Sequence, residues 1–174
     1  MFRNLVLVGF MGSGKSSVGR LLSSMTGFAL VDTDTLVAQE AGQSIPAIFK
    51  QHGEEHFRAL ETKVIASLVG RIGLIVATGG GAITVEENRK LLKQIGPVAW
   101  LDASPEHLYQ RVKHSKRPLL QTADPQKTVE ELYKARAPLY REAATVRIDS
   151  TKLTHRQTAE AVLAALQKQP NTDM

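Results

Sequence analysis

Cysteine is absent from this chain of 174 residues, and aromatic residues are scarce. Without cysteine the chain can form no disulfide, no thiolate zinc site and no cysteine nucleophile. Five Phe, three Tyr and one Trp are too few for an obvious base-stacking platform, which argues against a nucleic-acid partner. No apolar run is long enough to cross a bilayer, and the first residues lack the pattern of a signal peptide. We therefore expect a soluble, cytoplasmic monomer with no membrane partner.

The charge balance points to a different kind of partner. Hydrophobic residues make up 43% of the chain and charged residues 22%, which is the balance of an ordinary globular protein. Lys and Arg number 22 against 17 Asp and Glu, leaving a formal charge of +5. An excess of positive charge favours anionic partners, but by itself it does not distinguish a polyanion from a small anionic metabolite.

Apolar runs of strand length alternate with segments of helical period. The expected strands are residues 5–8, 28–31, 74–77, 98–101 and 146–148. The first four runs are continuous, which is typical of strands covered on both faces. The expected helices include residues 18–25, 54–69, 85–95, 129–140 and 154–166, with further helices beginning near Ser44 and Ser104. The alternation predicts one α/β domain over residues 1–174, with a parallel sheet between two helical layers.

A phosphate-binding loop follows the first strand. Residues 9–16, Gly-Phe-Met-Gly-Ser-Gly-Lys-Ser, match the pattern G-x-x-x-x-G-K-[ST] at every fixed position, between a strand and a helix. Backbone N–H groups of such a loop and the positive end of the following helix converge on phosphate oxygens. Lys15 can reach the β- and γ-phosphates, and the hydroxyl of Ser16 can ligate Mg²⁺. A glycine-rich turn without a ligand is the alternative.

Two further strands end in polar or glycine-rich segments. Asp32-Thr33-Asp34 follows the second strand, at the sheet edge that carries the phosphate loop. Asp32 could hold water on Mg²⁺ and Asp34 could accept a proton from an attacking hydroxyl, although one Asp could simply cap a helix. Gly79, Gly80 and Gly81 follow the third strand and could admit a ligand close to the backbone, or form a flexible linker. The third strand ends without an acidic residue, unlike the corresponding strand of ATPase motors.

Helical phase places two arginines on apolar faces. Arg58 lies at the edge of a face that also contains Glu61, with Glu54 one turn earlier. These groups could form a solvated ion pair, or Glu61 could orient Arg58 toward a ligand. Arg136 lies within the apolar stripe of a later helix, which Pro138 is expected to end or bend. An inward arginine needs an anionic partner, from the protein or from a ligand, and a carboxylate suits its forked geometry.

The segment of residues 112–125 is basic, irregular and bracketed by prolines. We expect it to form a lid. Lys113 and Lys116 are interpreted as solvated surface, whereas Arg117 could close over the γ-phosphate.

Taken together, these motifs resemble shikimate kinase over essentially the whole chain. The matching segments are residues 9–16, 32–34, 53–61, 79–82, 117–120 and 136–140. The phosphate loop alone is common to a very large superfamily, whereas the full set in this order is specific.

The resemblance implies a three-layer P-loop fold of the nucleoside-monophosphate-kinase type, with strand order 2-3-1-4-5. It implies transfer of the γ-phosphoryl group of ATP, with Mg²⁺, to the 3-hydroxyl of shikimate, on the route to chorismate and aromatic amino acids. The substrate-binding region would span residues 32–61. The implied catalytic residues are Lys15, Asp34 and Arg117. The implied ATP-binding residues are Gly12, Ser13, Gly14, Lys15, Ser16, Ser17 and Arg117. The implied shikimate-binding residues are Asp34, Arg58, Gly79, Gly80, Gly81 and Arg136. Ser16 would bind Mg²⁺, and Asp32 would do so through water. Family members often place an arginine near Lys152 against the adenine, and this chain has lysine there.

Two other functions remain as alternatives. One is a different small-molecule kinase on the same fold, acting on gluconate or a nucleoside monophosphate. The other is a nucleotide-dependent switch or regulatory module. The inward Arg136, the Asp pair and Arg117 argue against a switch, because a switch needs no pocket for a carboxylate-bearing acceptor.

Overall fold

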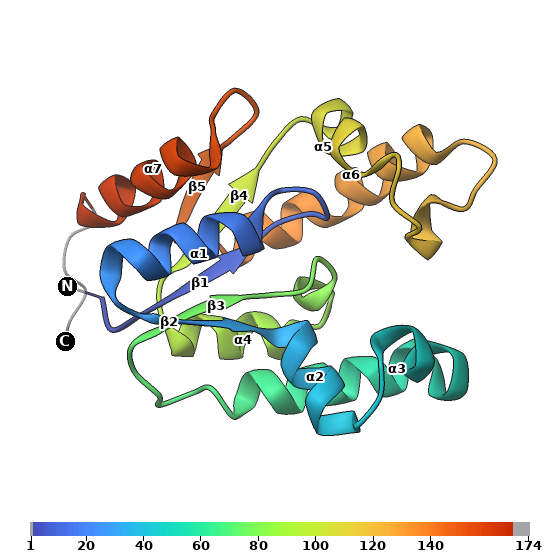
Figure 1. The fold of residues 1–174 in the computed structure, drawn as a ribbon, viewed down its shortest axis with the longest axis horizontal. Helices are drawn as coiled ribbons and strands as arrows, with labels where there is room; N and C mark the ends of the chain where they lie inside the picture. Colours follow the sequence, from blue (N-terminus) through green and yellow to red (C-terminus); the bar gives the residue numbers. More distant parts are fainter. Residues whose placement is uncertain (1, 169–174) are drawn as a thin grey trace.

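A five-stranded parallel sheet forms the centre of the computed structural model, which describes residues 2–168 (Figure 1). The strands are β1 (Asn4–Val8), β2 (Ala29–Asp32), β3 (Leu74–Ala77), β4 (Val98–Asp102) and β5 (Val146–Asp149). Their order is β2-β3-β1-β4-β5, and every neighbouring pair is parallel. The α/β class and the strand order implied by the resemblance are therefore confirmed.

Helices cover both faces of the sheet. The α-helices are α1 (Lys15–Thr26), α2 (Thr33–Ala41), α3 (Ile45–Ala66), α4 (Glu86–Ile95), α5 (Pro105–Val112), α6 (Pro125–Ala143) and α7 (His155–Gln167). Two short 3₁₀ helices, η1 (Ala82–Thr84) and η2 (Pro118–Leu120), lie in loops. Helices α1 and α7 pack on one face, and α4, α5, α6 and the end of α3 pack on the other. Within residues 2–168, no helix has the length and apolar character that a membrane crossing requires.

The burial of the strands follows their place in the sheet. β1, β3 and β4 are buried along their whole length, as their continuous apolar runs predict. The same prediction is wrong for β2, whose residues are only partly buried or exposed. β2 forms an edge of the sheet, so fewer neighbours cover it.

Three helices differ from the predicted pattern. α2 was missing from the predicted helices, and it begins where the Asp32 side chain accepts hydrogen bonds from the N–H groups of Asp34 and Thr35. α3 joins two predicted helices across a break at Gly53, where φ is 80°. α6 continues through Pro138 to Ala143, so it does not end at this proline and extends beyond the predicted range 129–140 at both ends. Tyr140 and Ala143 are buried in the core, and their packing offsets the backbone hydrogen bond that proline removes.

Candidate active site

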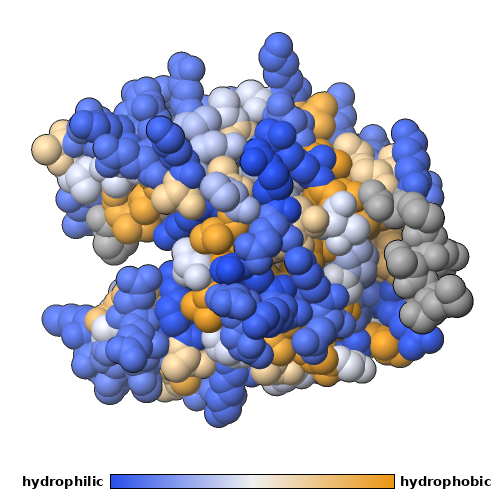
Figure 2. Space-filling model, turned by 180° about the vertical axis from the view of Figure 1, so that it is seen from behind, coloured by the Kyte–Doolittle hydropathy of each residue, from blue (hydrophilic) through white to orange (hydrophobic). Residues whose placement is uncertain are grey.

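The carboxyl ends of β1, β2 and β3 lie side by side and bring three predicted segments together. The phosphate loop follows β1, Asp32 ends β2, and Gly79–Gly81 follows β3. In Figure 1, the part of the molecule built on α5 and α6 and the part built on α2 and α3 extend beyond this edge on its two sides. Figure 2, seen from behind, shows a hollow between two such parts, with hydrophilic residues along one rim and both hydrophilic and hydrophobic residues along the other.

The phosphate loop has the local conformation that its sequence predicts. Gly12 and Gly14 have φ values of 78° and 88°, which favour glycine. The Lys15 ammonium donates to the carbonyls of Gly9 at 2.6 Å and Phe10 at 3.1 Å, and to Ser13 Oγ at 3.3 Å. Desolvation lowers the pKa of Lys15 to about 8, although Asp34 opposes the shift. The Lys15 ammonium therefore folds back onto its own loop, where little water reaches it and its charged form is disfavoured.

Asp32 uses its two carboxylate oxygens for different contacts. Oδ1 caps α2, so the capping interpretation holds for this atom. Oδ2 lies 3.5 Å from Ser16 Oγ, at the start of α1. One hydroxyl and one carboxylate oxygen beside a phosphate site form the oxygen donor set that Mg²⁺ uses together with substrate phosphates. The described residues contain no cluster of three or more His, Cys, Asp or Glu side chains placed to hold a metal. Ser16 and Asp32 therefore suit a Mg²⁺ ion whose remaining ligands come from the nucleotide phosphates and water.

Asp34 lies in the first turn of α2 and faces the glycine segment. Burial and the neighbouring Asp32 carboxylate raise the pKa of Asp34, whereas the charge of Lys15 lowers it. A Cβ atom at Gly79 would lie 2.7 Å from Asp34 Oδ1. A half-buried carboxylate with a raised pKa is suited to accept a proton.

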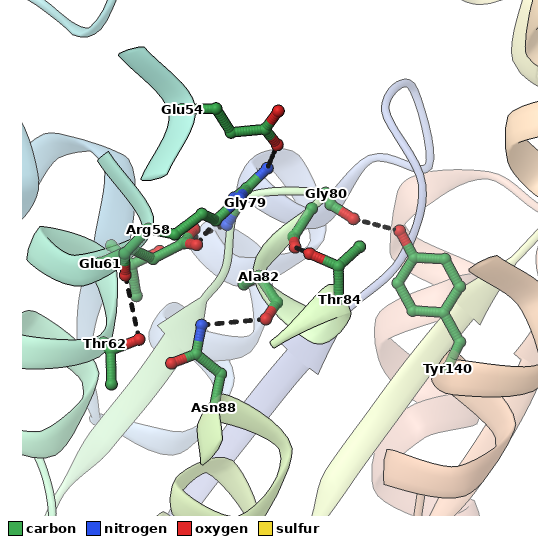
Figure 3. Close-up of polar contacts among 12 residues, drawn as sticks. Glu54, Arg58, Glu61, Thr62, Gly79, Gly80, Ala82, Thr84, Asn88 and Tyr140 are labelled. Atoms are coloured by element: carbon green, nitrogen blue, oxygen red, sulfur yellow. Dashed lines mark hydrogen bonds and ion pairs between the residues drawn. The ribbon is translucent and has the colours of Figure 1, made fainter. Parts of the chain in front are cut away.

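Arg58, on α3, is held by two carboxylates on the same helix. Its Nη1 donates to Glu61 Oε2 at 2.7 Å, and its Nη2 donates to Glu54 Oε1 at 3.3 Å (Figure 3). Glu61 is fully buried, and its burial raises the pKa against the effect of Arg58. The pair is therefore not a solvated surface ion pair. A Cβ atom at Gly81 would collide with the Arg58 guanidinium, so this glycine makes room for the side chain.

Arg136 lies on α6, on the opposite side of the hollow from α3. Its guanidinium carbon lies 5.7 Å from the ring centroid of Phe10, a residue of the phosphate loop. Among residues 2–168, no carboxylate lies within 4.0 Å of the Arg136 guanidinium. The described part of the protein therefore supplies no carboxylate partner for Arg136.

Arg117 is exposed on the segment between α5 and α6. Its charge contributes to lowering the pKa of both Lys15 and Asp34, so it acts on the phosphate side of the hollow. Lys113 and Lys116 are exposed, as expected of solvated surface. Lys152 is exposed in the loop before α7. The first residue of that helix, His155, approaches Gly14, so the loop lies beside the phosphate site.

Ser17 follows Ser16 on α1 and is half-buried, with its Oγ 3.4 Å from Arg20 Nη2. Ser13 is buried in the loop itself.

Sequence reasoning missed two residues beside the site. Asp102 ends β4 and binds Arg147 at 2.6 Å, Tyr133 Oη at 2.8 Å and the N–H of Ala103 at 2.9 Å. An Asp directly after the apolar run 98–101 could have drawn attention to it, although its carboxylate is fully used by the protein. The hydroxyl of Tyr140 on α6 donates to the carbonyl of Gly80 (Figure 3). Its apolar position in the helix suggested only a core residue.

Comparison with known proteins gives one consistent result. The family model described as "Shikimate kinase" matches residues 11–167. A shikimate kinase of Cupriavidus pinatubonensis is 46% identical over 94% of this chain and 86% of that protein. One of Symbiobacterium thermophilum is 44% identical over 95% of this chain and 97% of that protein.

Solved structures agree with these sequence comparisons. A shikimate kinase of Acinetobacter baumannii in complex with shikimate is 42% identical, with a TM-score of 0.90 over 95% of this chain and 93% of that one. A gluconokinase of Sinorhizobium meliloti is only 17% identical, with a TM-score of 0.60 over 95% of this chain and 92% of that one. The second likeness extends to the fold alone.

Proposed function

Because this chain belongs to the shikimate kinase family, we propose that the residues around the hollow transfer the γ-phosphoryl group of ATP to the 3-hydroxyl of shikimate. The observation that carries the proposal is Arg136, a cleft arginine without a carboxylate partner among residues 2–168. Across the hollow, Arg58 is the second guanidinium, and Glu61 holds it in place. Two guanidinium groups match the carboxylate of shikimate.

The nucleotide phosphates bind where the N–H groups of residues 12–17 and the start of α1 converge. Lys15 exchanges its three contacts within the loop for phosphate oxygens, which restore the charge interactions that burial removed. Ser16 and Asp32 would hold Mg²⁺, Asp32 through water. The ion would neutralise the phosphate charge as the reaction proceeds.

On the acceptor side, Asp34 takes the proton of the attacking hydroxyl. Its raised pKa makes Asp34 a stronger base than an ordinary aspartate, and the nearby charge of Lys15 favours the ionised form. The N–H groups of Gly80 and Gly81 have no acceptor within residues 2–168 and can bind the ring hydroxyls, whereas the N–H of Gly79 donates to Thr33. Arg117 closes over the transferring group from residues 112–125 and excludes water.

Lys152, exposed in the loop before α7, is our candidate for the adenine contact. We propose that residues 1–174 form a single domain and that the protein acts as a monomer. Its proposed location is the cytoplasm, where its co-substrate ATP is available.

A coupled assay of ADP release tests the reaction directly. With ATP and Mg²⁺, shikimate should support turnover, and gluconate and AMP should not. Turnover with gluconate or AMP but not with shikimate would refute the proposal. The assay in EDTA, followed by restoration with Mg²⁺, tests the metal.

Residue roles require a matched pair of variants. Arg136→Ala should abolish detectable turnover while leaving the melting temperature and ATP binding close to those of the wild type. Arg141→Ala removes an exposed arginine of the same helix and should retain wild-type activity. If Arg136→Ala unfolds the protein instead, the side chain is a structural element and our assignment is wrong.

A further inference from the structure

Each carbonyl group of the segment 79–83 accepts a hydrogen bond from the protein. The carbonyl of Gly79 accepts from the N–H of Ala82, and that of Gly81 accepts from Thr84 Oγ1 at 2.7 Å. Asn88 Nδ2, on α4, donates to the carbonyl of Ala82 at 3.0 Å. Arg89 donates to the carbonyl of Ile83, and Tyr140 donates to the carbonyl of Gly80. Side chains of α4 and α6 thus hold the carbonyls of Gly80, Ala82 and Ile83, and local bonds hold the other two (Figure 3).

The N–H groups of the same segment are arranged differently. The N–H of Gly79 donates to Thr33 Oγ1 at 3.2 Å. Those of Gly80 and Gly81 find no acceptor within residues 2–168. Because the carbonyls are engaged by the protein and two N–H groups are not, the segment has donors, rather than acceptors, left for a ligand.

Tyr140 differs from the other side chains that hold this segment, because it also belongs to the helix of Arg136. The two residues are four positions apart and therefore lie on the same face of α6. Tyr140 is fully buried, and its ring stacks on Trp100 of β4 with 5.7 Å between the centroids. Burial raises the pKa of Tyr140, so the hydroxyl stays protonated and donates.

Gly80 is placed between Tyr140 and the phosphate loop. A Cβ atom at Gly80 would lie 3.3 Å from the backbone nitrogen of Met11, in the loop. Arg136 reaches the neighbouring Phe10 from the α6 side. One hydroxyl therefore connects the helix that carries Arg136, the glycine segment and, through Gly80, the phosphate loop.

We propose that Tyr140 is a positioning residue for the acceptor substrate. Its hydroxyl fixes the Gly80 carbonyl, which keeps the Gly80 and Gly81 N–H groups directed into the hollow and in register with Arg136. It touches neither ATP nor the acceptor. The inference rests on the proposed binding of shikimate in this hollow.

The variant Tyr140→Phe tests this proposal, because it retains the ring and its stacking on Trp100 and removes only the hydroxyl. We expect KM for shikimate to rise about tenfold, since a carbonyl loses its donor and the segment loses its register. KM for ATP and kcat should each change less than about threefold. Trp100 is the only tryptophan of the chain, so its fluorescence provides an independent titration of shikimate binding.

Tyr133→Phe is the matched control. Tyr133 lies two turns earlier on α6, and its hydroxyl binds Asp102 at 2.8 Å, away from the glycine segment. Both variants lose one hydrogen bond and should lose similar thermal stability, but Tyr133→Phe should keep the wild-type KM for shikimate.

An equal rise of both KM values in Tyr140→Phe, a fall in kcat alone, or identical kinetics of the two variants would overturn the inference. A wild-type protein that does not phosphorylate shikimate would instead refute the proposed function, so the two failures are distinguishable.

Discussion

One methyl group added at each of residues 79–81 should produce three different kinetic defects. None of these glycines has a left-handed φ, so alanine fits the backbone at all three positions. What differs is the neighbour that the new Cβ atom meets. It would meet Asp34 at position 79, the phosphate-loop backbone at position 80 and Arg58 at position 81.

At Gly81 the Cβ atom overlaps the Arg58 guanidinium, which must move by roughly 1 Å or more to regain normal contact. Its bond to Glu61, 2.7 Å long, cannot survive such a movement unchanged. A hydrogen bond to a charged group contributes about 1.5–3 kcal/mol. At ~1.36 kcal/mol per factor of ten, KM for shikimate should rise roughly tenfold to 150-fold in Gly81→Ala, with KM for ATP unchanged.

At Gly79 the Cβ atom would lie 2.7 Å from Asp34 Oδ1, so the proposed base is displaced instead. Misplacing a reacting group by about 1 Å costs about 100-fold, and this loss should appear in kcat. At Gly80 the nearest atoms are Met11 N at 3.3 Å and Gly9 O at 3.6 Å. Such mild crowding should reduce transition-state stabilisation by about 1 kcal/mol, which lowers kcat/KM about fivefold.

Steady-state kinetics of the three variants, with both substrates varied, measure these parameters, and thermal melts confirm that each variant is folded. These assignments would be refuted if Gly80→Ala were the most impaired variant, or if Gly79→Ala and Gly81→Ala shared the same defect.

Three further predictions concern charged groups. Because Lys15 has a pKa of about 8 in the free protein and phosphate raises it, ATP binding should take up a proton between about pH 8 and pH 10.5. ATP affinity should therefore fall as pH rises through that window and stay level below it, and calorimetry in buffers of different ionisation enthalpy measures the uptake. Between these pH values the unfolded chain, with Lys15 protonated, binds more protons than the folded free protein, so the free energy of unfolding should rise with pH through this window. A Lys15→Met variant, which lacks the titrating group, should not show this rise and is the control. Glu61→Gln removes the buried charge but keeps an acceptor for Arg58, so KM for shikimate should rise about threefold to tenfold, and an unchanged KM would show that Arg58 needs no orientation. Asp102→Asn weakens the ion pair with Arg147. Because the Arg147 side chain is 53% exposed, we expect less than the full cost of breaking a buried pair: the free energy of unfolding should fall by about 2–3 kcal/mol and the melting temperature by about 5–10 °C. At temperatures where the Asp102→Asn variant is folded, its kinase activity should persist. If a folded variant were inactive, Asp102 would belong to the catalytic site.

Local patterns determined much of this protein from the sequence alone. The phosphate loop is a contiguous motif whose glycines, lysine and serine act within a few residues of each other, so its conformation depends little on the rest of the chain. The strands β1, β3 and β4 follow from uninterrupted apolar runs, because burial on both faces requires them. Helical phase correctly placed Glu61 inside an apolar face, and the full set of motifs identified the family.

The tertiary structure decided what lies opposite each of these side chains. Helical phase shows that Arg136 turns inward, but only the packing of α6 shows that it meets Phe10 rather than a carboxylate. The glycines of residues 79–81 suggested room for a ligand, and the fold shows that they also make room for Asp34 and Arg58. The bonds of Gly79 to Thr33 and of Gly80 to Tyr140 join residues 46 and 60 positions apart. No local pattern encodes such pairs, because they arise only when distant elements pack against the same edge of the sheet.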